Sequence, residues 1–166
     1  MYNECKTYLI EHLKAAGIKT NICTTMSKLT KCMESHVGAV IFEEENLNRN
    51  GSKTHFIEEG ARKKRRKVFD RSLSFTVVIG EYTDEAVEEI YETFLSGLDT
   101  GIYINGNYVP IEADRAEWVD KDDSILKANL AVQVKITFGG GIYKDTDFAK
   151  LSEVMVESVE KGKEPS

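Results

Sequence analysis

Carboxylates crowd the segment between residues 112 and 123, and they are the side chains of this chain best suited to hold a divalent cation. They are Glu112, Asp114, Glu117, Asp120, Asp122 and Asp123. A metal-dependent nuclease needs two or three carboxylates that converge on an ion, often beside a lysine such as Lys121 or Lys127. The turn DKDDS lacks the glycine and the terminal glutamate of a calcium-binding loop. We therefore interpret this segment as a solvated acidic turn and keep a metal-dependent nuclease as an alternative.

Cysteine and histidine offer a second chemistry, a zinc site. Cys32 and His36 have a C-x3-H spacing that Cys5 and Cys23 would have to complete. Structural zinc sites usually show two tightly spaced ligand pairs, and this sequence has no CxxC pair. Three cysteines also do not make a disulfide framework, and they suit a reducing compartment. We expect free thiols and no bound metal.

Motifs for nucleotide binding and for nucleophilic catalysis do not occur in the sequence. There is no G-x-x-x-x-G-K-[ST] and no G-x-S-x-G. The histidines His12, His36 and His55 have no evident nucleophile to activate. We predict that the protein is not an enzyme and binds no cofactor.

Charge is distributed very unevenly along the chain. The formal net charge is −6, yet residues 62–67 read RKKRRK. Removing these six from the 22 basic residues leaves 16 against 28 acidic residues, a net charge of −12. So acidic a surface repels phosphate backbones, which disfavours nucleic-acid binding by the protein as a whole. The basic run needs an explanation of its own.

Two kinds of partner suit this run. In an extended chain, Arg62, Lys64 and Arg66 point one way while Lys63, Arg65 and Lys67 point the other. A DNA clamp would use only one set, whereas neighbouring subunits, or glutamates on the preceding strand, would use both. We predict pairing within or between subunits, and keep a nucleic-acid-binding module as an alternative. The glutamates considered are Glu43, Glu44 and Glu45.

Periodicity predicts the elements that position these charges in the first half of the chain. Apolar residues recur at helical spacing over residues 2–16, and Gly17 ends that helix. Residues 18–34 show no clear pattern, and residues 38–42 (GAVIF) indicate a strand. Residues 46–67 are expected to form a long projecting loop or hairpin, with RKKRRK at its returning base.

The second half of the chain has clearer patterns. Alternation from Phe69 to Ile79 predicts a half-buried strand, and Thr83 caps a helix with a continuous apolar stripe. Asn105-Gly106 predicts a tight hairpin with Tyr103 opposite Tyr108. A slip of parity near Asp114 predicts a bulge. The next strand alternates from Ile125 to Phe138, Gly139–Gly141 ends it, and a last helix is expected from about Asp145.

Together these patterns predict one α+β domain over residues 1–160 and a mobile tail over residues 161–166. The expected order is α-β-β-α-β-β-β-α, with a mostly antiparallel sheet covered on one face by two or three helices. No apolar run approaches the roughly 20 residues that cross a bilayer, and the N-terminus lacks the apolar region of a secretory signal. We expect an intracellular protein with no membrane partner.

The segment from Phe69 to Tyr143 resembles a known family. It contains the strand RSLSFTVVIG, the helix EAVEEIYETFLSGL, the hairpin GIYINGNYVPIE, the segment AEWVDKDDS and a strand that ends in TFGGGIY. The order of these elements and the sequences of the hairpins resemble those of the tail terminator (tail-completion) proteins of tailed bacteriophages and phage-tail-like bacteriocins, especially contractile ones.

The resemblance implies a structural protein of the virion tail, assembled in the host bacterial cytoplasm. Its subunits would form a hexameric ring that caps the tail tube, ends tube polymerisation and offers a surface to head-completion (connector) proteins. A sheath protein is a further implied partner, and DNA would pass through the lumen only as cargo. On this view Arg62–Lys67 meet a neighbour or the connector, with Tyr103, Tyr108 and Trp118 as candidate contact aromatics. The acidic residues of that interface would be Glu43, Glu44, Glu45, Asp120, Asp122 and Asp123.

Overall fold

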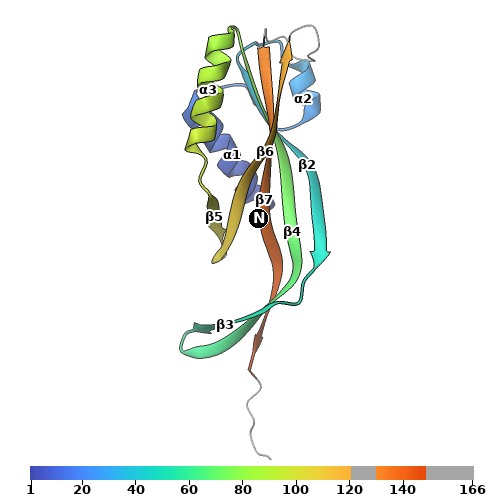
Figure 1. Ribbon diagram of the computed structural model, residues 1–166, viewed down its shortest axis with the longest axis vertical. Coiled ribbons are helices and arrows are strands. Elements are labelled where there is room, and N and C mark those ends of the chain that lie inside the picture. Colours follow the sequence, from blue (N-terminus) through green and yellow to red (C-terminus); the bar gives the residue numbers. More distant parts are fainter. Residues whose placement is uncertain (121–129, 149–166) are drawn as a thin grey trace, which may run out of the picture.

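A long curled sheet forms most of the protein in the computed structural model, which describes residues 1–120 and 130–148 (Figure 1). The expected mixed class of helices and strands is confirmed, with strands predominating. The elements in chain order are α1 (Tyr2–Ala16), β1 (Ile22–Cys23), α2 (Met26–Lys31), β2 (Val37–Arg49), β3 (Lys53–Glu58), β4 (Ala61–Glu81), α3 (Asp84–Gly97), β5 (Gly101–Ile104), β6 (Asn107–Asp120) and β7 (Leu130–Asp147).

The sheet has the strand order β1-β2-β4-β7-β6-β5, and β3 pairs with the first part of β4. Every pairing is antiparallel except that of β1 with β2. Strand β4 is the longest, so it pairs with β3 at its start, with β2 at its end, and with β7 along nearly its whole length. One continuous strand therefore joins the two ends of the molecule.

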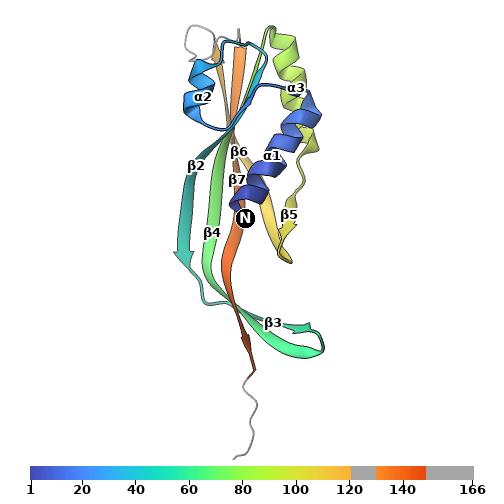
Figure 2. The same cartoon turned by 180° about the vertical axis from the view of Figure 1, so that it is seen from behind.

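Helices cover both faces of the sheet, which corrects the expectation of a single covered face. The larger core joins the buried stripes of α1 and α3 to alternate residues of β4 and β7. The smaller core places Leu29 of α2 against Val37, Ala39 and Val78, which point to the opposite side of the sheet. Figure 2 shows α1 and α3 to one side and α2 to the other. Strands β2 and β4 have apolar residues at adjacent positions because both of their faces are buried there.

The alternation predicted for the two central strands is confirmed. In β4, Leu73, Phe75, Val77 and Ile79 are fully buried in the larger core. In β7 the same face carries Val132, Val134, Ile136 and Phe138, which are also buried. The predicted Leu126 and Ala128 of that stripe lie outside the described residues.

The predicted hairpin and bulge are confirmed as well. Tyr103 pairs with Tyr108, and Asn105 and Gly106 have φ values of 50° and 76°, as a type I′ turn requires. Between Ala113 and Ala116 the register of β6 on β7 shifts by one residue. That extra residue explains the change of parity along the strand.

In three segments the structure forms other elements than the sequence predicts; two of them lie in the first half of the chain. The patternless residues 18–34 contain β1 and α2, and the Thr25 hydroxyl caps α2 by accepting a 3.3 Å hydrogen bond from the Lys28 amide. Residues 46–67, expected to form a loop or hairpin, are mostly strand, because β2 runs on to Arg49 and β3 pairs with β4. Such short elements hold too few residues for periodicity to reveal them.

The triple glycine does not end β7, which continues to Asp147. Cβ atoms on Gly139 and Gly140 would lie 3.3 Å from the Pro110 ring and 2.6 Å from the Met1 side chain. The glycines therefore make room for two neighbouring segments rather than a turn. The helix expected from about Asp145 is wrong for residues 145–147, which are strand, and its remainder and the tail lie outside the described residues.

Candidate protein-interaction surface

The basic run lies in a small three-stranded sheet that we call the tip. It consists of β3, residues 61–67 of β4 and residues 143–147 of β7, paired in regular register. Glu59 and Gly60 join β3 to β4 with φ values of 49° and 78°. Figure 1 shows β3 at the end of the long axis opposite to the helices. The six cations are therefore held in extended strand, as the alternation argument assumed.

One face of the tip, the paired face, has its charges balanced within the chain. Lys63 forms an ion pair with Glu58, and the Lys67 ammonium lies 2.6 Å from the Asp70 carboxylate. The Arg65 guanidinium donates two hydrogen bonds to Asp145, of 2.8 and 2.7 Å. These contacts account for Lys63, Arg65 and Lys67, one alternate set of the run.

The electrostatics of the paired face follow from these contacts. Hydrogen bonds from the Arg65 guanidinium lower the pKa of the Asp145 carboxyl from its ordinary value. Lys67, together with the Asn50 amide, lowers the pKa of Asp70 in the same way. Arg65 also lies 4.8 Å above the Phe56 ring, so its position is fixed by packing as well as by charge. This face is therefore internally satisfied.

The other face of the tip, the basic face, has no such balance. Alternation places Arg62, Lys64 and Arg66 on it, and the register adds Lys53 and Lys144, which flank Arg66 on the two neighbouring strands. Besides the cations, this face carries His55, Ile57 and Thr146 on its strands and Phe148 just after β7, none of which is a carboxylate, and Glu59 lies in the turn that joins β3 to β4. Within residues 1–120 and 130–148, none of the five cations forms an ion pair.

Apolar side chains accompany the cations of the basic face. Phe148 is 44% exposed, and its ring centroid lies 5.3 Å from that of His55 and 5.8 Å from the Arg62 guanidinium. Ile57 is 74% exposed on the same face. Cations interleaved with exposed apolar groups are typical of surfaces that bind a partner, since the apolar groups gain from leaving water.

One of the predicted options, pairing of the basic run with Glu43, Glu44 and Glu45 of the same chain, does not occur in the described residues. These glutamates lie farther along the sheet, where β2 faces residues 73–75 of β4. Glu44 pairs with Lys135 at 2.9 Å and Glu45 pairs with Arg71 at 2.5 Å. The glutamates do not reach the cations because β2 pairs with a later part of β4, and β3 occupies the edge of β4 beside the cations.

The candidate contact aromatics fall in two places. Tyr103 is 77% exposed and its ring lies 5.3 Å from that of Tyr108, so the β5–β6 hairpin carries an aromatic pair. Trp118 packs edge-on against Tyr91 of α3 at 5.4 Å, and it is 45% exposed. Of these three residues, Tyr103 is the most accessible to a partner. None of the three lies on the tip.

The candidate metal ligands do not come together in the described residues. Glu112, Asp114 and Glu117 are exposed on β6, Asp120 ends that strand, and Asp122 and Asp123 lie outside the described residues. No group of three or more His, Cys, Asp or Glu residues suited to a metal ion occurs in residues 1–120 and 130–148. The cysteines are divided as well, since Cys5 belongs to the larger core while Cys23 lies in the smaller core, on the other side of the sheet.

A shallow groove of about 360 Å³ separates the β5–β6 hairpin from β4 and β7. It is lined by Arg65, Arg71, Asn107, Tyr143 and Asp145, among others. Both arginines already bind carboxylates of the chain, Asp145 and Glu45. The groove therefore offers no free cation to an anionic substrate.

Sequence reasoning missed part of the basic face. Lys53, His55 and Ile57 belong to an unexpected strand, and Lys144 and Phe148 follow glycines that were expected to end β7. Gly60 is a turn signal, but the flanking segments KTHFIE and ARKKRRK do not alternate in character, so the β3–β4 hairpin had little local pattern to reveal it.

Comparison with models of known protein families gives no match, and comparison with curated proteins gives none either. In the described part of the chain, no helix combines the length and the apolar character needed to span a bilayer.

Proposed function

We propose that this protein is a structural subunit of a phage-type tail. Six copies of it would close into a ring at the end of the tail tube. In this role it ends tube polymerisation and offers a surface to head-completion proteins, with DNA as passing cargo and a sheath as a further partner. The observation that carries the proposal is the basic face: five cations at one end of an acidic subunit that has no counter-ions for them in residues 1–120 and 130–148.

A surface of this kind supports assembly because no carboxylate within residues 1–120 and 130–148 balances its charges, and a neighbouring copy can supply such carboxylates. Contact between different patches of identical subunits is heterologous, and such contacts close into a ring when the rotation between copies allows it. Complementary charge also sets the register and suppresses wrong pairings. The elongated sheet keeps the basic face far from the helices, so the face remains accessible when other surfaces are covered (Figure 2).

The resemblance of residues 69–143 to tail terminators supplies the identity of the assembly. That segment spans most of β4, with α3, β5, β6 and most of β7, apart from residues 121–129. The described side chains support a structural role rather than catalysis, since the exposed carboxylates of β6 do not converge and the groove arginines are already paired.

Negative-stain imaging and native mass measurement of the purified protein test the proposal. We expect a ring, with six copies as the expected number, that binds the end of isolated tail tubes and stops further addition of tube subunits. A protein that remains monomeric at high concentration and also fails to bind tail tubes would contradict the proposal.

The basic face also favours a second candidate function, nucleic-acid binding. Five cations on neighbouring strands would release about five counter-ions from duplex DNA, which predicts a slope of roughly −4.5 for log K against log salt concentration. Fluorescence anisotropy with a labelled duplex measures that slope. Tight, salt-dependent binding that is lost when Arg62, Lys64 and Arg66 become glutamine would favour this candidate over ring assembly.

A further inference from the structure

The structure carries a second unbalanced surface, on α3. Four glutamates recur there at spacings of three and four residues, so they share one stripe of the helix. They are Glu85, Glu88, Glu89 and Glu92. All four are exposed, and none forms an ion pair in the described part of the chain. Like charges at these spacings destabilise a helix, so this stripe gains from a partner of opposite charge.

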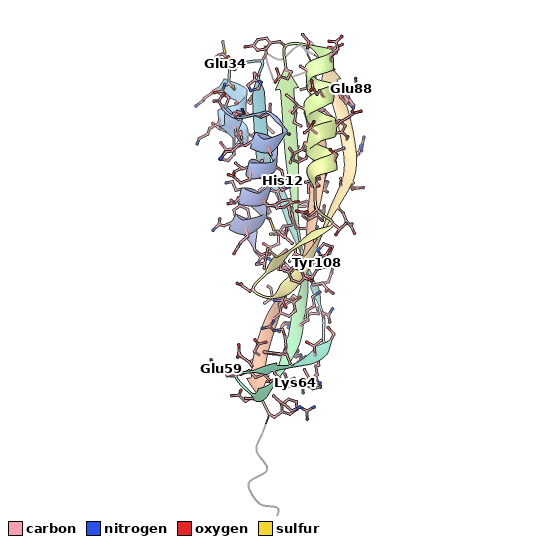
Figure 3. All side chains as sticks on the ribbon, turned by 90° about the vertical axis from the view of Figure 1, so that its left-hand side faces the viewer. His12, Glu34, Glu59, Lys64, Glu88 and Tyr108 are labelled. Carbon is pink, nitrogen blue, oxygen red and sulfur yellow. The ribbon has the colours of Figure 1, made fainter. Side chains whose placement is uncertain are left out.

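These two surfaces cannot meet within one molecule. Figure 3 places Glu88 of α3 near one end of the long axis and Lys64 of the tip near the other. The long strands β4 and β7 hold the two ends apart. A contact between the basic face and the α3 stripe therefore requires a second copy of the chain.

The dimensions of the two surfaces agree. The row Lys53, Arg66, Lys144 crosses three strands, about 10 Å, and four residues separate Arg62 from Arg66, about 13 Å. Along α3, the seven residue steps from Glu85 to Glu92 rise about 10.5 Å, or two turns. A two-turn helical stripe thus spans the basic face, with cations within reach along its whole length.

We propose that the basic face of the tip docks on the glutamate stripe of α3 in the next copy, head to tail. This inference rests on the proposed function and deepens it by naming the two surfaces of the subunit contact. Each copy uses its tip toward one neighbour and its α3 toward the other, as a heterologous contact requires. Phe148 and Ile57 add apolar contact area beside Arg62, at the end of the basic face nearest the β3–β4 turn.

A reciprocal exchange of charge tests this contact. The first variant, tip-reversed, carries Arg62→Glu, Lys64→Glu and Arg66→Glu. These positions make no ion pair in the described residues, so we expect the variant to fold. Mass photometry and sedimentation velocity should show self-association weakened by about 100-fold or more, because three attractive pairs become repulsive.

The second variant, helix-reversed, carries Glu88→Lys, Glu89→Lys and Glu92→Lys. It keeps Glu85 in the first turn of α3, where a carboxylate is favourable to the helix dipole. Self-association should weaken to a similar extent. An equimolar mixture of the two variants should recover wild-type association to within about tenfold, because every tip then meets an α3 of opposite charge. Recovery in the mixture also shows that both variants are folded.

A matched control makes the same change of net charge at positions outside the tip. Lys19→Glu, Lys31→Glu and Arg115→Glu together alter the net charge as the tip-reversed variant does, at exposed positions away from the tip. This control should associate as the wild type does. Self-association should also fall in 1 M salt, where the screening length is about 3 Å.

Three results would overturn the inference. They are undiminished association of the tip-reversed variant, no recovery in the mixture, and a monomeric wild type whose basic face instead binds duplex DNA. The proposed function fails separately. If the charge exchange works but the assemblies are open chains that do not bind tail tubes, the contact stands and the ring function does not. If both variants still form rings that cap tubes, the function stands and this contact does not.

Discussion

Phe75 should be among the most costly side chains to remove, because it joins α1 to the centre of the sheet. It lies in β4, is fully buried, and packs against three other aromatic rings. The centroid distances are 5.5 Å to Phe42, 5.9 Å to Phe138 and 5.8 Å to Tyr2 of α1. All three distances fall in the range in which aromatic pairs add to the free energy gained by burial.

The expected magnitude follows from these contacts. Replacing a buried phenylalanine with alanine costs about 3–5 kcal/mol, and the three ring contacts place Phe75→Ala in the upper half of that range. Domains of this kind unfold with a free energy of about 5–15 kcal/mol, so the variant should lose a large fraction of its stability. Phe75→Leu keeps most of the volume and should cost only about 1 kcal/mol.

Guanidinium chloride unfolding, followed by the fluorescence of the single tryptophan, measures these differences. Trp118 reports on the core because it packs against Tyr91 of α3. The surface control is Met33→Ala, at a side chain that is 73% exposed, and it should change the free energy of unfolding by no more than about 0.5 kcal/mol. If Phe75→Ala costs no more than this control, the assignment of the central core is refuted.

Three further predictions concern the tip and the thiols. Arg65 of β4 lowers the pKa of Asp145 of β7, so their contact should protect the amides of residues 143–147 from hydrogen exchange above about pH 3.9, the pKa of a free aspartate. That protection should be lost as the pH falls through the lower folded pKa. Arg65→Met should remove this pH dependence, and an unchanged profile would argue against the ion pair. Burial raises the pKa of the Cys5 thiol to about 12, so at pH 8 a thiol reagent should label the half-buried Cys32 long before Cys5. Mass analysis of the labelled peptides measures the two rates, and equal rates would contradict the buried position of Cys5. Gly60 has φ 78°, so Gly60→Ala should strain the β3–β4 turn by about 1–2 kcal/mol. Amide hydrogen exchange should become faster in the tip alone. Faster exchange in α1 or α3 would show that the tip is not an independent unit of stability.

The sequence predicted well those elements whose neighbours lie close along the chain. The helix after Thr83, the Asn105-Gly106 turn and the alternating strand around Phe75 each depend on local spacing, and the structure confirms them. The bulge after Ala113 was also predictable, because one extra residue shifts every later side chain to the other face.

The elements that were missed depend on contacts between distant segments. Gly140 lies within a strand, paired with Arg71, and a glycine is needed there because the Met1 side chain packs where a Cβ would stand. No local pattern in the sequence records that contact. The partners of Glu45 depended on how far β2 extends, and the sequence alone gave no limit to that extension. For the candidate site, alternation separated the six cations into two sets correctly, but the identity of the flanking strands decided which set was left without carboxylates.

The length of β4 has a mechanical consequence. Its 21 residues extend about 70 Å if fully straight, and β7 runs beside it in antiparallel register along nearly all of that distance. Their hydrogen bonds lie perpendicular to the strands, so a pull along the long axis loads them together in shear instead of opening them one after another. Tension along the long axis should therefore be resisted by many hydrogen bonds of the β4–β7 pair at once.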